Sequence, residues 1–190
     1  MKTIKTNIII LFIFLVSIIS CRSQSLPLNS NMKDIPSNAH VKDLDNELSQ
    51  YVGTYKANFQ GSEIILYITK TEDKLMDYGN QKFYRDVLIV KYIVKNSAGT
   101  VLQDTKSNNT TNIEFYSYYT YPTKNTVVFY YSGTNCRVGW GDVFLKKINS
   151  TQLSWEYRPD DIILDSNKCP SGTDINIYLP ETKDLIFTKQ

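Results

Sequence analysis

The sequence lacks the short motifs that mark the common classes of enzyme. It contains no Gly-x-Ser-x-Gly turn of serine hydrolases, no phosphate-binding loop, no glycine pattern of dinucleotide-binding folds and no His-Glu-x-x-His of zinc peptidases. Its single histidine, His40, has no set of catalytic partners nearby in the sequence, and we expect it to be a solvated residue just before a helix. These absences argue against an enzyme, and we expect no catalytic residue, no metal site and no cofactor.

One group of carboxylates keeps a hydrolase open as an alternative. Asp160, Asp161 and Asp165 follow Arg158 and Pro159 at the end of an expected strand. Paired carboxylates can act as general acid and base, or bind calcium through oxygen. The spaced acids and glycine of a calcium-binding loop are absent, so a solvated turn explains these three residues better.

An excess of charge of one sign is also missing. The chain has 21 Lys and Arg against 19 Asp and Glu, and Lys2 and Lys5 lie in a segment that we expect to be removed, which makes the two numbers equal. A neutral domain has no electrostatic reason to bind nucleic acid and no basic patch for anionic lipid. We therefore expect no nucleic acid partner.

No apolar run approaches the ~20 residues that a membrane-spanning helix requires. Ile8 to Val16 form an unbroken run of nine apolar residues after two lysines, which is the layout of a secretory signal. The apolar stretch ends at Ile18-Ile19-Ser20-Cys21, which resembles the lipobox of bacterial lipoproteins. We expect residues 1–20 to be a lipoprotein signal peptide that is removed, leaving Cys21 as a lipidated N-terminus. An ordinary signal peptide cleaved near Ser20 is the alternative.

The lipobox resemblance implies a location. In bacterial lipoproteins the cysteine thiol carries a diacylglyceryl group and the new amino group is acylated, so the lipid holds the protein on a membrane. Arg22 stands where an aspartate favours retention in the inner membrane, and no acidic run follows Cys21. The resemblance therefore implies a protein of the cell envelope, anchored in the outer membrane and facing the periplasm.

Cysteine is scarce, with three residues in the chain. If Cys21 carries lipid, Cys136 and Cys169 remain as a pair in an oxidising compartment. We expect them to form a disulfide, which contributes roughly 3–4 kcal/mol in the chain-entropy model. A metal site at these cysteines is disfavoured because the only histidine lies far away in the sequence, and no Cys-x-x-Cys indicates redox catalysis.

The mature chain has the length of one domain. Residues 21–39 are polar with two prolines, and we expect them to be the lipidated cysteine and a flexible tether. Residues 40–190 then form a single β-rich domain. Apolar residues at i, i+3 and i+7 predict one short helix over residues 41–50, at the start of this domain.

Beyond residue 50 the pattern is that of short strands. Leu88, Val90, Tyr92 and Val94 alternate with other residues and form the clearest half-buried strand. Further strands are expected at residues 51–57, 62–71, 113–121, 126–132, 138–148, 152–158 and 175–179. Because these strands are short and no long helical pattern accompanies them, we expect a mainly β domain of about 8–10 strands, folded as an antiparallel barrel or a β-sandwich.

Tyrosine is abundant, with 14 residues. Tyr116, Tyr118, Tyr119 and Tyr121 crowd one expected strand, and Trp140 lies between two glycines that indicate a bulge or a close approach of backbones. We take these five aromatic residues as the candidate surface for a ligand or a partner. Half-buried packing, with the hydroxyl in water, is the alternative for each tyrosine.

Two known families resemble parts of the mature chain. Leu48–Lys56 (LSQYVGTYK), Tyr84–Val94 (YRDVLIVKYIV) and Tyr178–Gln190 (YLPETKDLIFTKQ) are similar to segments of a family of small secreted Gram-negative lipoproteins of unknown function, which implies no activity. Gly53-Thr54-Tyr55, after a short helix, resembles the start of lipocalin-like barrels, in which Trp usually stands at the place of Tyr55. This second resemblance implies a barrel that carries a small apolar ligand.

Two functional hypotheses stand beside the hydrolase. The first is a lipid-anchored, non-catalytic module that binds a small ligand or an envelope protein, and a deep apolar cavity would favour it. The second is a structural or accessory envelope lipoprotein that acts through protein contacts, and a solid core with an exposed aromatic patch would favour it. Carboxylates that converge in a cleft would favour the hydrolase.

Overall fold

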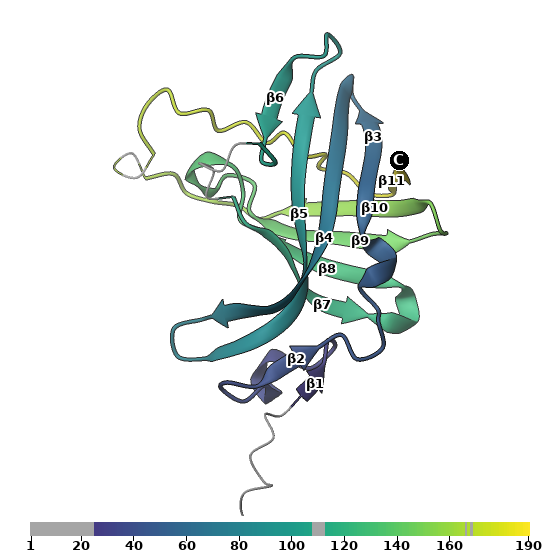
Figure 1. Cartoon of the computed structure of the whole chain (residues 1–190). Helices are drawn as coiled ribbons and strands as arrows, with labels where there is room; N and C mark the ends of the chain where they lie inside the picture. Colours follow the sequence, from purple (N-terminus) through teal and green to yellow (C-terminus); the bar gives the residue numbers. More distant parts are fainter. Residues whose placement is uncertain (1–24, 108–112, 166, 168) are drawn as a thin grey trace, which may run out of the picture.

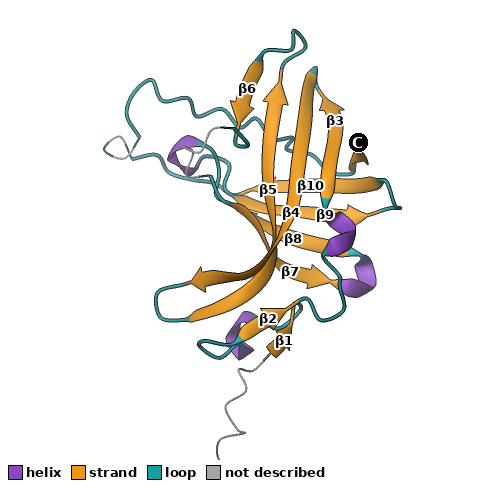
Figure 2. Cartoon of the chain, in the orientation of Figure 1, coloured by secondary structure: helices purple, strands orange, loops and turns teal. Residues whose placement is uncertain are grey.

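The computed structural model describes residues 25–107, 113–165, 167 and 169–190, so the expected lipidation site Cys21 lies outside the described residues. Eight antiparallel strands close into a barrel, which Figures 1 and 2 show. In chain order they are β3 (Gly53–Phe59), β4 (Ser62–Asp77), β5 (Lys82–Lys95), β7 (Phe115–Tyr121), β8 (Thr126–Tyr131), β9 (Gly141–Lys147), β10 (Gln152–Pro159) and β11 (Leu185–Lys189). Each pairs with the next of these strands, and β11 returns to β3. This up-and-down order confirms the mainly β, antiparallel barrel and excludes the sandwich.

Two strand pairs close the ring. β3 meets β11 where Lys56 opposes Thr188, and β5 meets β7 where Ile89 opposes Tyr116. Strands β3 to β5 stand upright in Figure 1 whereas β7 to β10 run across the view, so the two halves of the barrel cross. β5 is longer than its contact with β7, and its ends pair with the short strands β6 (Val101–Asp104) and β2 (His40–Lys42) instead.

Alternating side chains decide which face of each strand points inward. Leu88, Val90, Tyr92 and Val94 on β5 are all at most 2% exposed, which confirms the alternation expected for this strand. Ile64, Leu66 and Ile68 on β4 are buried in the same way. Burying such aliphatic side chains contributes roughly 1.5–3 kcal/mol each, so a one-residue slip of register would be costly.

Aromatic rings fill the interior of the barrel. The ring of Phe115 lies within 6.4 Å, centroid to centroid, of the rings of Tyr92, Phe129, Tyr131 and Trp155. Edge-to-face pairs of this kind contribute about 0.5–1.5 kcal/mol beyond the area that they bury. An eight-stranded barrel is just wide enough to be filled by side chains or to hold one small ligand. These rings occupy that space, so this part of the barrel is a core rather than a cup.

The N-terminal segment packs against the barrel, and the prediction of a flexible tether over residues 21–39 is wrong from Ser25 onward. β1 (Ser25–Pro27) pairs in parallel with β2, and the 3₁₀ turn η2 (Met32–Asp34) follows. Leu28, Ile35 and Ala39 are at most 3% exposed. The domain therefore includes this segment, because isolated apolar residues in a polar sequence anchor it.

The helix predicted over residues 41–50 is also wrong. Val41 is a buried strand residue in β2, and only the 3₁₀ turn η3 (Ser49–Tyr51) lies near the end of this span. The Asp43 carboxylate accepts hydrogen bonds from the amides of Glu47 (2.6 Å) and Leu48 (3.3 Å). A short aspartate side chain that bonds nearby amides offers the backbone an alternative to a helix. No helix of the described chain is long and apolar enough to cross a membrane.

The β4–β5 hairpin continues past the barrel as an arm, residues 74–85, which curves away at the bottom left of Figure 1. A register shift between Thr71 and Lys74 separates the arm from the barrel part of β4. Irregularities of this kind bend a strand and increase its twist. The bend places the arm beside the N-terminal segment and near the outer side of β7.

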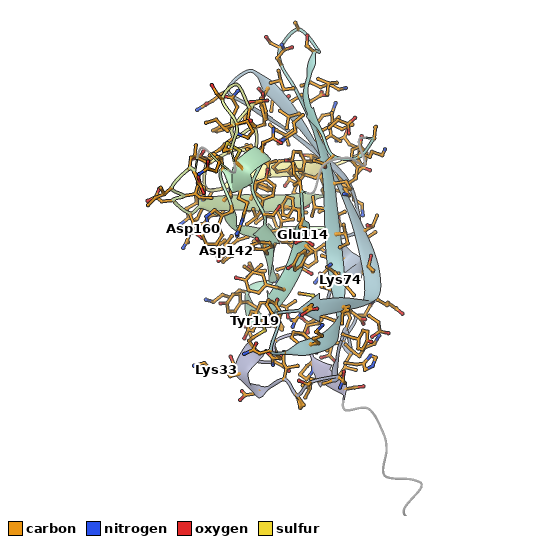
Figure 3. The ribbon with its side chains drawn as sticks, turned by 90° about the vertical axis from the view of Figure 1, so that its left-hand side faces the viewer. Lys33, Lys74, Glu114, Tyr119, Asp142 and Asp160 are labelled. Atoms are coloured by element: carbon orange, nitrogen blue, oxygen red, sulfur yellow. A yellow bond between two sulfur atoms is a disulfide. The ribbon has the colours of Figure 1, made fainter. Side chains whose placement is uncertain are left out.

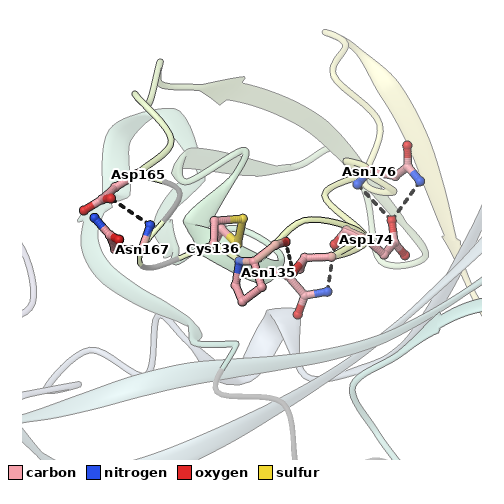
Figure 4. The surroundings of a disulfide bond; sticks show 9 residues. Asn135, Cys136, Asp165, Asn167, Asp174 and Asn176 are labelled. Carbon is pink, nitrogen blue, oxygen red and sulfur yellow. Dashed lines mark hydrogen bonds between the residues drawn. A yellow bond between two sulfur atoms is a disulfide. The ribbon is translucent and has the colours of Figure 1, made fainter.

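A disulfide joins Cys136, in the 3₁₀ turn η5 (Asn135–Arg137), to Cys169, as expected from the cysteine count. Figure 4 shows its surroundings, where Asn135 donates a hydrogen bond to the Asp174 carbonyl at 2.8 Å. The strand predicted over residues 175–179 is wrong, because the described residues between β10 and β11 run as a loop. Trp155 donates its indole N–H to the Pro180 carbonyl at 2.9 Å, which fastens this loop to the barrel.

Candidate ligand-binding site

The outer side of β7 carries a dense group of tyrosines, which we call the tyrosine face: Tyr116, Tyr118, Tyr119, Tyr121 and, from β8, Tyr130. A register shift between Ser117 and Tyr119 places two consecutive tyrosines there instead of one. The Tyr119 and Tyr121 rings lie 4.9 Å apart, and the Tyr116 and Tyr130 rings 5.6 Å apart. The structure thus brings together the four tyrosines that the sequence singled out.

Trp140 lies apart from this group. It precedes β9, donates its indole N–H to the Asp161 carbonyl at 3.3 Å and lies under the Arg137 guanidinium at 5.6 Å. A Cβ at Gly141 would collide with the Arg158 carbonyl, which confirms the close backbone approach expected beside Trp140. The same Arg137 guanidinium lies 3.5 Å from the Tyr130 hydroxyl, so Arg137 is the link between Trp140 and the edge of the tyrosine face.

A cavity of about 210 Å³ lies between the tyrosine face, the hairpin arm and the N-terminal segment. We call it the arm cavity. Three separate parts of the chain supply its mainly apolar wall: Ser30, Asn31, Met32 and Ile35 from the N-terminal segment, Met76, Tyr78, Phe83 and Arg85 from the arm, and Tyr118 and Tyr119 from β7. In Figure 3 Tyr119 lies above Lys33 and below Asp142. Two residues of the tyrosine face, Tyr118 and Tyr119, therefore form the floor of a pocket.

Arg85 is the one charged residue in the wall of the arm cavity. It is 3% exposed and donates a hydrogen bond to the Leu28 carbonyl. No carboxylate of the described residues forms an ion pair with it. Burial lowers the pKa of Arg85 to about 10, although the nearby Tyr78, Tyr119 and Asp86 oppose that shift. At neutral pH the cavity therefore contains a buried cation.

Lys74 increases the positive charge on this side of the arm. It opposes Arg85 directly in the β4–β5 pairing. Two residues nearer the tip, Met76 opposes Phe83, and the side chains of both pairs lie on the same face of the arm. The Lys74 ammonium lies 4.8 Å from the centre of the Tyr116 ring. Like charges that face each other across a strand pair destabilise it, so Lys74 and Arg85 need a compensating group.

The opposite side of the arm carries a fully paired charge cluster around Asp86. Its carboxylate accepts hydrogen bonds from the Lys42 ammonium (2.9 Å) and from the amides of Asp43 (3.0 Å) and Asp73 (3.1 Å). Burial pushes the pKa of Asp86 upward, but these hydrogen bonds outweigh burial and leave the pKa below its usual range. This cluster fixes the N-terminal segment to the arm and so holds two walls of the arm cavity together.

His40 belongs to the same paired side rather than to a solvated position before a helix. It lies in β2, where its Nδ1 is 2.7 Å from the Asp73 carboxylate and its ring stacks on Tyr84 at 4.9 Å. The hydrogen bond from His40, with those from Lys42, lowers the pKa of Asp73. The sequence-based expectation for His40 was wrong because the segment that contains it is a strand.

Asp142 lies at the other end of the tyrosine face. Tyr118 donates its hydroxyl to Asp142 at 3.1 Å. Burial raises the pKa of the Asp142 carboxyl, and the charge of Asp160 adds to this effect, whereas the Tyr118 hydroxyl opposes it. The tyrosine face is therefore electropositive at the arm and carries a destabilised carboxylate at the far end.

The carboxylates considered for a hydrolase do not converge. Asp160, Asp161 and Asp165 are exposed along the loop after β10. The Asp165 carboxylate accepts a hydrogen bond from the Asn167 amide at 2.9 Å, which Figure 4 shows, and this is a turn contact. Within the described ranges no group of three or more His, Cys, Asp or Glu side chains is placed to hold a metal ion.

A larger hollow of about 570 Å³ lies where η3 meets the end of β7. Exposed polar residues such as Asp45, Asn46 and Asn125 supply much of its wall. Thr120 is buried there, and its hydroxyl is the one buried side-chain polar atom of the described chain without a hydrogen bond. No buried charge lies in this wall, so the arm cavity is the stronger candidate for selective binding.

Sequence reasoning found the tyrosines but missed Arg85 and the two methionines of the arm cavity. An available signal was the pair Arg85-Asp86 inside the apolar strand 84–94, since charged residues rarely occur buried unless they are paired or functional. Met32 and Met76 gave no signal, because they meet only through the packing of the N-terminal segment on the arm.

Comparisons with known proteins identify a family and no activity. No significant match to a curated protein or to a solved structure was found. Over its whole length, residues 1–190, the chain matches the family described as "Family of unknown function (DUF6705)". The chain therefore belongs to the DUF6705 family.

Proposed function

We propose that this protein is a lipid-anchored, non-catalytic module of the cell envelope that binds a small ligand in the arm cavity. The observation that carries this proposal is the cavity itself: three segments far apart in sequence enclose about 210 Å³ with mainly apolar walls. Ligand sites are typically concave, mostly apolar and equipped with a few placed polar groups. Because aromatic rings fill the barrel interior, the outer cavity replaces the lipocalin-like cup as the binding site.

The structural or accessory hypothesis has less support. Of the tyrosine face, Tyr121 is the one exposed member, at 41%, and the other four tyrosines are half-buried. A docking surface for a protein partner normally presents a contiguous exposed apolar patch. Half-buried tyrosines that line a cavity fit a small ligand better.

The proposed anchor places the arm cavity close to the membrane. Ser25, the first residue of β1, is only four residues after Cys21, a span of at most about 14 Å. A lipidated Cys21 would therefore hold the β1–β2 end of the domain near the lipid headgroups. We expect the Cys21→Ala protein to be soluble after fractionation, whereas the wild type pellets with membranes. A variant that still pellets would contradict the anchor.

Two methionines make ligand binding measurable. The chain has three methionines, and Met32 and Met76 lie on two different walls of the arm cavity, while Met1 is in the expected signal peptide. With ¹³C-methyl-methionine, NMR of the Cys21→Ala protein reports directly on the cavity. We expect both methyl signals to shift, with saturation, when benzene-sized compounds such as benzoate or benzamide are added. Unchanged signals with every such compound would contradict the proposed function.

A further inference from the structure

The Arg85 guanidinium has more hydrogen-bonding capacity than the protein uses. A guanidinium has five N–H donors, and the hydrogen bond that Arg85 forms goes to one backbone carbonyl, that of Leu28. A buried charge without a partner is costly, and proteins normally pair it. The neighbouring Asp86 does not pair with Arg85, because its carboxylate lies on the other side of β5 and accepts hydrogen bonds from Lys42 and two amides.

The surroundings of Arg85 favour negative charge. Lys74 opposes Arg85 in the strand pairing, so two cations lie side by side, and within the described part of the chain no carboxylate forms an ion pair with either of them. Lys33 is the residue after Met32, which lies in the cavity wall. The Lys33 side chain is exposed and lies near Tyr119 in Figure 3. An anion in the cavity would contact Arg85, and the positive charges of Lys74 and Lys33 outside the cavity wall would add a longer-range attraction.

The remaining wall specifies the rest of the ligand. Met32, Ile35, Met76 and Phe83 offer apolar contacts, and the hydroxyls of Tyr78 and Tyr119 are chemically able to donate to an oxygen. An apolar cavity of about 150 Å³ is enough for benzene. The arm cavity, at about 210 Å³, therefore has room for a ring of that size with one small charged group.

We infer that the arm cavity binds a small organic carboxylate, with its charged group on the Arg85 guanidinium and its apolar body against Met32, Met76 and Phe83. Arg85 makes the charge-assisted, paired hydrogen bonds that a planar carboxylate accepts. Lys74 strengthens the attraction from the opposing strand. This inference rests on the proposed function and names the ligand class of that same cavity.

A matched pair of probes tests the role of charge. Benzoate and benzamide have nearly the same shape, but only benzoate is charged at pH 7. We expect benzoate to bind the Cys21→Ala protein about tenfold or more tightly than benzamide, followed by the methyl signals of Met32 and Met76. Equal affinities would overturn the inference and leave the proposed function standing. No shift with either probe would overturn both.

Variants test the role of Arg85 itself. Arg85→Leu is expected to remove the preference for benzoate while benzamide still binds, and Arg158→Leu, an exposed arginine on β10, is expected to retain the preference. Arg85→Lys and Lys74→Leu are expected to weaken the binding of benzoate several-fold and to leave the binding of benzamide unchanged. These two variants provide the test if Arg85→Leu does not fold. Unchanged benzoate affinity in these variants would overturn the inference.

Inorganic phosphate is the last probe. It carries charge without an apolar body, so we expect it to bind far more weakly than benzoate and to leave the Met32 and Met76 signals near their starting positions. If phosphate bound as tightly as benzoate, the site would be one for simple anions. That result would overturn the organic part of the inference.

Discussion

Arg85 and Asp86 are consecutive buried residues of opposite charge on β5, yet they form no ion pair with each other. Each is 3% exposed. Asp86 contacts Lys42 and two amides on one side of the arm, whereas Arg85 lines the arm cavity and contacts a carbonyl. The alternation of side chains along a strand separates them. One charge is therefore used for stability, and the other remains available for a ligand.

Replacing Arg85 with leucine is expected to leave the free energy of unfolding within about 1 kcal/mol of the wild type, or to raise it. The exchange removes the cost of burying an unpaired charge, whereas the lost hydrogen bond to the Leu28 carbonyl costs only about 1 kcal/mol. Urea unfolding of the ligand-free protein measures this. A loss above about 2 kcal/mol would indicate that Arg85 is a structural residue rather than a ligand-binding one.

Replacing Asp86 with alanine is expected to lower the free energy of unfolding by about 3 kcal/mol. The change leaves two amides without their partner and Lys42 with Asp73 alone, and removing one member of a buried ion pair typically costs 3–5 kcal/mol. Glu156→Gln, which removes the exposed pair with Arg158, is the control and should stay within about 0.5 kcal/mol. Equal effects of the two variants would contradict the role given to Asp86.

The same cluster predicts how stability changes in acid. The pKa values of Asp86 and Asp73 are lower in the folded protein than in the unfolded chain, so the folded state gains stability above the unfolded value of about 3.9. That gain is lost as the pH falls from about 4 through the folded pKa values. Urea unfolding from pH 6 to pH 2 should show the loss in the wild type and a smaller loss in Asp86→Ala. Parallel curves would contradict the prediction.

The pKa of Asp142 is shifted in the opposite direction, so its effect on stability has the opposite dependence on pH. Its pKa is raised in the folded protein, so its favourable contribution exists below the unfolded pKa of about 3.9 and is lost as the pH rises through the folded value. Asp142→Asn removes the ionisation and is expected to raise the free energy of unfolding at pH 7 while having little effect at pH 3. The comparison of unfolding curves at these two pH values is the measurement, and a variant effect that is the same at both would refute the shift.

The disulfide is expected to stabilise the folded protein by roughly 3–4 kcal/mol, because it closes a loop between residues 33 apart in sequence. The Cys136→Ser, Cys169→Ser double variant should lose this amount. The wild type in a reducing agent should unfold at the same denaturant concentration as the double variant. If the oxidised and reduced proteins unfolded alike, the bond would have no stabilising role.

The sequence predicted the strands with clear alternation but not the features that build the cavity. Leu88 to Val94 alternate strictly, and the structure buries them as predicted, because one face of the strand must reach the core. Residues 41–50 have helical spacing, but Asp43 bonds nearby amides and Val41 pairs with Arg85 of β5 instead. A pattern of apolar residues describes one segment at a time and does not include such long-range contacts.

The sequence predicted the tyrosines of the candidate site but not its other walls, because those walls depend on long-range contacts. The tyrosines of β7 stand out by composition, so the floor of the arm cavity was found. Its walls depend on the register shift before Lys74, which bends the arm, and on Leu28 and Ile35, which hold the N-terminal segment in place. Neither a bulge nor the packing of two isolated apolar residues leaves a periodic signal.

Native mass spectrometry of the protein purified from its own host's envelope tests the central claim most directly. The wild type is expected to retain a small molecule that is identified, after release, as a carboxylic acid, and Arg85→Leu purified in the same way is expected to carry none. If both proteins carry no small molecule, or both carry the same neutral one, the assignment of the arm cavity as a site for an organic carboxylate is contradicted.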